Sequence, residues 1–319
     1  MAITEHRDPA EPNLPGIPEG EVGRRTPIAV VNDYITLTKP PIILLLLVTA
    51  AGGMFLAQAH TAAGGLPSLY LMALVWVGGA LASGGANALN HHYDRDIDLV
   101  MRRTRQRPVA SNRISPTKAF LFGIVLNVVA FAILALWVNL LAAGLTLSAT
   151  LFYVLIYTRW LKRSTPHNIV IGGAAGAIPP MVGWAAVTGT VELPAVYLFA
   201  LVFFWTPPHF WALSLLIQKD YEEANVPMLP VVSSRNFTVS TIFLYTLVLV
   251  GVTLMFALTD AVGWIYGGSA LALGAIFTWM AWRLRQDEST ANARKLYLYS
   301  LLYLGLLFVA VMVGAATGY

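Results

Sequence analysis

The chain has 319 residues, a mean hydropathy of +0.66 and a formal net charge of +4. Only 11% of its residues are charged, against about 25% in an ordinary soluble domain, so a soluble globular protein is excluded and a polytopic membrane protein is indicated. The absence of cysteine excludes disulfides, thiolate metal sites and a cysteine nucleophile.

The first 27 residues are rich in Pro, Glu and Gly and cannot bury a core. We therefore expect a disordered tail at 1–27, followed by one membrane domain at 28–319. No basic segment followed by an apolar core is visible near the start. The first membrane span is expected to act as its own insertion signal.

We predict nine membrane-spanning helices, because nine apolar stretches are long enough to cross about 30 Å of hydrocarbon and a helix satisfies its own backbone in lipid. The fold class is thus an all-α polytopic membrane protein. The spans are expected near 41–59, 68–89, 117–137, 139–158, 168–188, 194–217, 237–257, 263–283 and 296–318.

The orientation follows from lysine and arginine. All 20 precede the first span, or lie in or beside the connections after spans two, four, six and eight. This alternation is the positive-inside pattern, which places the N-terminus on the cytoplasmic side and the C-terminus on the opposite side. The basic pI is then explained by topology, and a nucleic-acid partner is not expected.

The stretch Asn87–Pro108 is the most charged part of the chain, with three aspartates and five arginines. Asn90, Asp94 and Asp98 fall at i, i+4 and i+8, so on a helix they share one face, while Asp96 is expected to point away. Convergent oxygen ligands beside arginines suit a hard divalent cation that holds a phosphate-rich ligand.

The end of the fourth span carries aromatic and basic side chains. Tyr153 and Tyr157 share a helical face and line either a pocket or an aromatic belt. Arg159, Lys162 and Arg163 either reach the phosphate of a ligand or serve as ordinary cytoplasmic anchors.

The fifth and sixth spans each contain a Pro-Pro pair, at Pro179–Pro180 and Pro207–Pro208, which predicts distorted helices around an internal cavity. Gly172 and Gly176 form a small-xxx-small pair suited to close helix packing. His209 is either a functional intramembrane group or a core histidine bonded to a carbonyl.

The connection after the sixth span holds a second acidic cluster, Asp220, Glu222 and Glu223. It is either a solvated loop or the place where Asp220 completes a metal site with Asp94 and Asp98.

A prenyl diphosphate suits this combination of features. Its tail belongs among apolar helices, and its diphosphate belongs at the interface, held by carboxylate-bound Mg²⁺ and cationic side chains that stabilise the departing charge. The remaining carbocation needs a dry, electron-rich cavity. The aromatic candidates for that cavity are Tyr153, Tyr157, Trp205 and Trp211.

The motif N-x-x-x-D-x-x-x-D at Asn90, with the following R-R-T-x-x-R-P, resembles the first aspartate-rich motif of the UbiA-type intramembrane prenyltransferases. Further blocks resemble the haem-farnesylating members of that family, the haem O synthases, over about residues 30–318. They read Y-D-R-D-I-D-x-x-M, Y-T-x-x-L-K-R, I-G-G-A-A-G-A-I-P-P, W-T-P-P-H-F-W-A-L and D-Y-x-x-A-x-V-P-M-L-P.

The resemblance implies nine helices around a central cavity, with cytoplasmic loops capping the active site. It implies Mg²⁺-assisted ionisation of farnesyl diphosphate, addition of the farnesyl group to a vinyl group of haem b, and quenching by water to give haem O. It also implies the lipid bilayer of a bacterial inner membrane, and product transfer to a haem A synthase or a terminal oxidase assembly factor.

The resemblance assigns site residues by class. The metal ligands are Asn90, Asp94, Asp98 and Asp220; the diphosphate residues are Arg102, Arg103, Arg107, Arg159, Lys162 and Arg163; the candidate haem contacts are His209, His91 and His92. One position departs from the family pattern, since Ala224 stands where many relatives have a second aspartate. Asp220 alone is therefore favoured as the ligand from this connection, with Glu222 or Glu223 as possible substitutes.

Two other interpretations stay open. One is a prenyltransferase with a different acceptor, such as a quinone precursor or chlorophyllide, which would share the aspartate motif. The other is a secondary transporter, since broken helices and intramembrane polar groups occur there. The acids of this chain lie at cytoplasmic span ends rather than at the membrane midplane, which disfavours transport.

Overall fold

The computed structural model describes residues 26–318. The tail predicted at 1–27 lies outside these residues except for Thr26 and Pro27, where the Thr26 side chain caps the first helix. The elements are α1 Pro27–Thr38, α2 Pro40–Ala59, α3 Leu69–Tyr93, α4 Arg95–Val100, α5 Pro116–Trp137, α6 Leu140–Leu151, the π-helix η1 Phe152–Leu161, α7 Lys162–Ser164, α8 Asn168–Ala177, α9 Pro179–Thr188, α10 Leu193–Leu216, α11 Gln218–Glu223, α12 Leu229–Val232, α13 Arg235–Ala257, α14 Trp264–Gln286 and α15 Thr290–Thr317.

The nine predicted spans are confirmed within residues 26–318, where nine helical stretches are long and apolar enough to cross a membrane. The fourth is the continuous run α6–η1–α7, and the fifth is the pair α8–α9. The helices extend past several of the predicted stretches: α3 continues to Tyr93, the α6–η1–α7 run to Ser164 and α14 to Gln286, and α15 begins at Thr290. These extensions carry polar residues that hydropathy alone leaves outside a span.

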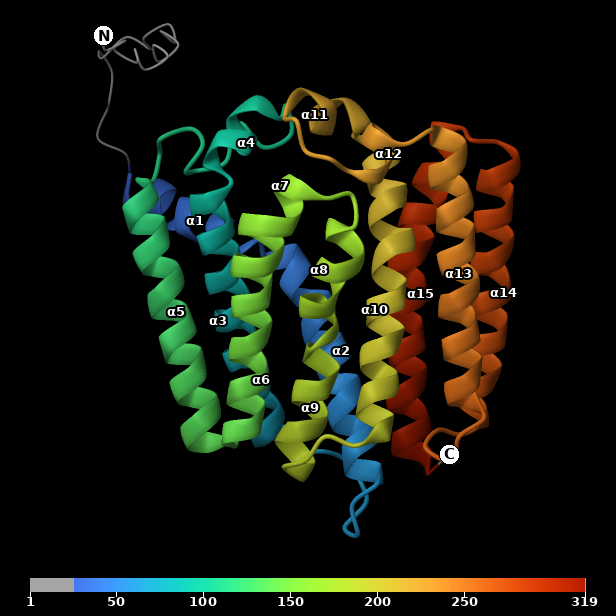
Figure 1. Cartoon of the computed structure of the whole chain (residues 1–319). Coiled ribbons are helices and arrows are strands. Elements are labelled where there is room, and N and C mark those ends of the chain that lie inside the picture. Colours follow the sequence, from blue (N-terminus) through green and yellow to red (C-terminus); the bar gives the residue numbers. More distant parts are fainter. Residues whose placement is uncertain (1–25, 319) are drawn as a thin grey trace, which may run out of the picture.

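The spans stand side by side, and the short helices α4, α11 and α12 lie together at one end of the bundle (Figure 1). The beginning of α1 is at this same end, whereas α15 finishes at the other. We call the end with α4, α11 and α12 the capped end. The largest apolar core joins α2, α9, α10, α13, α14 and α15, with Trp184, Phe277 and Phe308 among its fully buried side chains.

The two Pro-Pro pairs behave differently. The helix is interrupted ahead of Pro179, so that α8 and α9 are separate helices, as the sequence predicts. Pro207 and Pro208 lie inside α10, which continues through them. The physical reason is that α10 is the most buried of the spans. The helices packed around it stabilise the helical conformation where the two prolines remove backbone hydrogen bonds.

Two helices, α2 and α9, cross in near backbone contact. A Cβ atom at Gly53 would lie 2.0 Å from the Pro180 carbonyl oxygen, and one at Gly183 would lie 1.9 Å from that of Ala50. Of the predicted glycine pair in α8, Gly172 lies against the Tyr157 ring, whereas a Cβ at Gly176 would meet nothing within 4 Å among the described residues.

Candidate active site

The candidate site forms where α3 reaches the capped end. The sequence pattern predicts one helix through Asn90, Asp94 and Asp98, but α3 ends at Tyr93 and the chain bends at Asp94 before α4 begins. The amides of Asp94 and Asp98 still donate to the carbonyls four residues earlier, at 2.9 and 2.7 Å, so the helical spacing survives the bend. All three side chains are buried.

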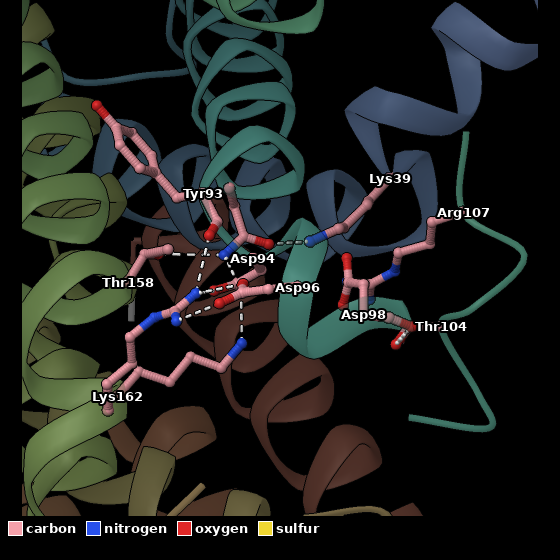
Figure 2. A network of polar contacts seen from close by, with 11 residues as sticks. Lys39, Tyr93, Asp94, Asp96, Asp98, Thr104, Arg107, Thr158 and Lys162 are labelled. Atoms are coloured by element: carbon pink, nitrogen blue, oxygen red, sulfur yellow. Dashed lines mark hydrogen bonds and ion pairs between the residues drawn. The ribbon is translucent and has the colours of Figure 1, made fainter. Parts of the chain in front are cut away.

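Asp94 lies at the centre of a polar network (Figure 2). Lys162 Nζ donates to its Oδ2 at 2.5 Å, and Asn90 Nδ2 donates to the same oxygen at 2.7 Å. Asn90 Nδ2 also lies 3.1 Å from the Thr158 hydroxyl oxygen. Lys162 and Thr158 come from the fourth span, so this network ties α3 to the run η1–α7.

Asp98 is hydrogen-bonded by residues of the loop that follows α4. The Arg107 guanidinium donates to both carboxylate oxygens, at 2.8 and 2.9 Å, and the Thr104 hydroxyl donates to the Asp98 carbonyl at 3.1 Å. The loop after α4 thus folds back on Asp98 and brings one predicted diphosphate residue, Arg107, into the site.

Lys39 is a site residue that the sequence analysis missed. It joins α1 to α2 in a left-handed backbone conformation, with φ 53° and ψ 61°. Its Nζ donates to Asn90 Oδ1 at 2.8 Å (Figure 2). Burial, followed by the nearby Arg107 charge, lowers the pKa of Lys39 to about 7. The sequence signal that could have identified it is a single lysine directly before Pro40 and an apolar span.

Asp96 is much more exposed than Asp94 and Asp98, with 62% of its side chain accessible, and it shares the Arg163 guanidinium with Asp94. Arg163 donates to both Asp96 oxygens at 2.7 Å and to the Tyr93 carbonyl at 2.8 Å. These hydrogen bonds lower the pKa of Asp96 to about 2. Arg163, a predicted diphosphate residue, is engaged in fastening α4 to α7.

The other predicted diphosphate residues lie nearer the surface. Arg102, Arg103 and Arg159 are exposed, and the Arg159 guanidinium lies 5.9 Å from the centre of the Tyr93 ring. The Arg103 backbone amide donates to Asp220 Oδ2 at 3.3 Å, which joins the loop after α4 to α11. Glu222 and Glu223 are exposed. The cap therefore brings Asp220 to the loop that carries the arginines.

An aromatic group lies under the cap. Tyr153 and Tyr157 of η1 stack with ring centres 5.6 Å apart. Tyr157 packs in an apolar cluster with Ile97 of α4 and Tyr221 of α11. Burial raises the pKa of the Tyr221 phenol, which keeps it a neutral hydrogen-bond donor. Tyr221 was not among the predicted site residues, because only the cap brings it near the first motif.

The predicted tryptophans lie in the α10 core. Trp205 Nε1 donates to the Ser300 carbonyl at 2.7 Å, and Trp211 packs edge-on against Tyr245. These contacts are with α15 and α13, whereas Tyr153 and Tyr157 belong to η1, and α8 lies between the α6–η1 run and α10 (Figure 1).

The three candidate histidines have different surroundings. His209 is bonded to Ser300 Oγ at 2.7 Å and stacks between Trp205 and Tyr297. His92 donates to the Pro116 carbonyl at 3.0 Å. His91 is 1% exposed, and neither ring nitrogen has a hydrogen-bond partner among residues 26–318.

The donor set fits a divalent cation in part. Asp94 Oδ1 is buried and receives no hydrogen bond from the described residues, and the Arg163 guanidinium lies 3.8 Å from it. Within residues 26–318 no three His, Asp or Glu side chains are clustered as a ready metal site. A cation here would therefore be held by Asp94 and Asp98 with the amide oxygen of Asn90, oxygen donors that hard cations prefer.

The chain resembles known proteins in both sequence and fold. The family model described as "UbiA prenyltransferase family" matches residues 45–316. A solved digeranylgeranylglyceryl phosphate synthase aligns over 90% of this chain and 99% of its own, with a TM-score of 0.73 and 17% identity. A UbiA homologue from Archaeoglobus fulgidus, solved with GPP and Mg²⁺, aligns over 88% and 99% with a TM-score of 0.66 and 18% identity. At these identities the two structures support the fold.

Closer relatives are named protoheme IX farnesyltransferase. One from Gloeobacter violaceus is 52% identical over 89% of this chain and 92% of its own length. One from Roseiflexus sp. is 48% identical over 96% of this chain, which spans only 56% of that longer relative. Since the family model covers most of the chain and about half of the residues match these relatives, the chain belongs to the UbiA prenyltransferase family.

Proposed function

We propose that the chain transfers the farnesyl group of farnesyl diphosphate to a vinyl group of haem b, with addition of water, to give haem O. The observation that carries the proposal is the buried set Asn90, Asp94 and Asp98, placed with Lys39, Lys162 and Arg107 at the capped end of an apolar helical bundle. The relatives named protoheme IX farnesyltransferase support haem b as the acceptor.

In this proposal Mg²⁺ is held by Asn90, Asp94 and Asp98, with Asp220 as a further ligand from α11. When bound, the ion neutralises charge on the diphosphate and so favours its departure. Lys162 and Arg107 already point into the site and would bind phosphate oxygens directly. Arg102, Arg103 and Arg159 would supply cationic charge at the surface. Arg163 would act indirectly, because its hydrogen bonds to Asp96 position α4.

The farnesyl C–O bond breaks and the diphosphate takes the electron pair. A new C–C bond then forms between the farnesyl carbon and the vinyl group, and water adds to the cation left beside the porphyrin while losing one proton. Tyr153 and Tyr157 belong to η1, the segment whose Thr158 is bonded to Asn90, and would face the developing charge. Trp205 and Trp211 would line the cavity from the α10 side.

Haem b is proposed to meet one or more of His209, His91 and His92. His91 offers two buried nitrogens without partners in the described chain, whereas His209 and His92 would have to exchange an existing hydrogen bond. The product would pass to a haem A synthase or a terminal oxidase assembly factor. The capped end would face the cytoplasm of a bacterial inner membrane.

The direct test is mass spectrometry of haems extracted from cells that express the full chain. A haem b adduct heavier by one farnesyl group and one water is expected. Asp94→Asn and Asp98→Asn each should lower its amount by about 100-fold or more, since each removes a negative charge that would hold the Mg²⁺ of the diphosphate.

Asp260→Asn is the matched control, because Asp260 is exposed in the connection between α13 and α14. It should leave haem O formation unchanged. A farnesylated quinone precursor in place of the haem adduct would refute haem b as the acceptor. Near-normal haem O in the Asp94→Asn protein would refute the metal assignment.

A further inference from the structure

A groove runs along the outer face of α13 and α14, which lie side by side at the edge of the bundle (Figure 1). Its volume is about 450 Å³. Phe243, Val250 and Leu254 line it from α13, and residues between Leu271 and Trp282 line it from α14. The volume is in the range of small-molecule sites, about 300–1,000 Å³. None of these residues belongs to the candidate active site.

Small side chains at the middle of the groove explain its shape. Ala275 lines the groove between larger residues. Gly274 brings α14 close to α13, since a Cβ atom there would lie 3.0 Å from a methyl carbon of Val250. Along each helix the lining residues extend over about 16 Å, at about 1.5 Å per residue. One leaflet of the bilayer core is about 15 Å thick. The groove therefore has the length of one leaflet, and its mainly apolar lining suits one extended acyl chain.

Two arginines lie at the capped end of this groove, near the last turn of α14. The Arg283 guanidinium lies 5.4 Å from the centre of the Trp279 ring, and the Arg285 guanidinium lies 5.7 Å from that of the Phe243 ring. Both rings line the groove, one from each helix. Both arginines are exposed. A guanidinium that packs on an aromatic ring keeps N–H groups with which to bind an anion.

The acidic side chains of the adjoining turn are engaged elsewhere. Asp287 Oδ2 accepts a hydrogen bond from Asn292 at 2.9 Å. Glu288 Oε1 accepts one from Asn236 at 3.0 Å. Within residues 26–318 neither groove arginine forms an ion pair with a carboxylate. Two positive charges are therefore present where the head group of a lipid in this groove would lie.

We propose that the groove binds an anionic phospholipid, with one acyl chain between α13 and α14 and the head-group phosphate at Arg283 and Arg285. Guanidinium groups bind phosphate oxygens through charge-assisted hydrogen bonds. The predicted orientation places both arginines in the cytoplasmic leaflet, which carries anionic lipids. A zwitterionic phospholipid offers the same acyl chain, but the arginines repel its head-group cation. Selectivity for a net negative head group therefore distinguishes this site from ordinary contact with the bilayer.

The test uses the full chain in nanodiscs of phosphatidylcholine that contain a small fraction of a photoreactive phospholipid. The probe carries a diazirine on one acyl chain and is either phosphatidylglycerol or phosphatidylcholine. Labelled peptides are mapped by mass spectrometry. Relative to all labelled peptides, those of the groove should react about fivefold or more strongly with the phosphatidylglycerol probe. Equal labelling of the groove by both probes would indicate ordinary bilayer lipid and overturn the proposal.

Variants separate the charge of the site from its shape. Arg283→Gln and Arg285→Gln should each reduce the preference by about fivefold, and the double variant should react equally with both probes. Lys118→Gln removes an exposed charge at the start of α5 and should keep the preference. Ala275→Phe should fill the groove and lower its labelling by both probes. Ala272→Phe, at an exposed position of α14 outside the groove, should leave the labelling unchanged.

Two further outcomes would overturn the proposal. One is a preference for phosphatidylglycerol that persists in the double arginine variant. The other is a second copy of the chain as the occupant of the groove. In that case light scattering would show a wild-type dimer that Ala275→Phe dissociates, and the two probes would label the groove equally. Neither result depends on haem or on farnesyl transfer.

Discussion

At the scale of single residues, His209 shows how a polar side chain serves packing as well as chemistry. Its ring lies 4.3 Å from Trp205 and 4.9 Å from Tyr297, measured between ring centres, and it is bonded to Ser300. These contacts fix α10 against α15. The same ring is a proposed haem contact, so the two roles need measurements that separate them.

His209→Ala is expected to lower the free energy of unfolding by about 2–4 kcal/mol, because it removes a buried ring and leaves the Ser300 hydroxyl without this partner. Thermal unfolding in detergent measures this effect.

If His209 also contacts haem, an absorbance titration of the His209→Ala protein should show haem b binding weakened by about tenfold or more, with Mg·pyrophosphate binding unchanged. The exposed His60 supplies the control His60→Ala. Loss of Mg·pyrophosphate binding with normal haem binding would remove His209 from the haem site.

At the scale of helices, the crossing of α2 and α9 sets where Lys39 is held. Gly53 and Gly183 let the two backbones touch, and Lys39 directly precedes α2. A change at this crossing would therefore displace the helix that follows the site lysine.

Gly183→Ala is expected to destabilise the protein by about 1–3 kcal/mol, because the new methyl group would overlap the Ala50 carbonyl and neither backbone can retreat without moving its helix. Gly176→Ala is the matched control, since its methyl group would meet no described atom within 4 Å. It should be neutral or stabilising by up to about 1 kcal/mol. Thermal unfolding of both variants checks this, and equal stability of the two would contradict it.

At the scale of the whole molecule, the capped end gathers α4, α11, α12 and the beginning of α1, while the connection containing Asp260 lies at the other end (Figure 1). The lysine and arginine pattern predicts that the capped end faces the cytoplasm. The chain has no cysteine, so single cysteines can report on its orientation.

In intact cells, a membrane-impermeant maleimide should label Asp260→Cys and leave Lys118→Cys unlabelled until the cells are opened. Both positions are exposed, so reactivity should depend on the side of the membrane rather than on burial. Labelling of Lys118→Cys alone in intact cells would reverse the predicted orientation.

The sequence predicted the spans well because hydropathy and length are local properties. The burial of Asn90, Asp94 and Asp98 also agrees with their helical spacing. The sequence could not indicate that Lys39 would reach Asn90 or that Tyr221 would join the site, since both depend on tertiary packing across the bundle. The same limit applies to Arg163, whose partner Asp96 lies 67 residues earlier and was expected to have no role in the site.

The π-helix η1 determines which face of the fourth span carries its polar residues. A π turn accommodates one residue more than an α turn, and each residue of an α-helix advances by about 100° around the axis. Thr158 and Lys162 reach Asn90 and Asp94 from the end of this wider segment. If the same residues formed an α-helix, each turn would hold about one residue fewer, so Thr158 and Lys162 would no longer point towards Asn90 and Asp94, although every residue of the first aspartate motif would be unchanged. The helix type of this apolar span is therefore as much a part of the site as its charges.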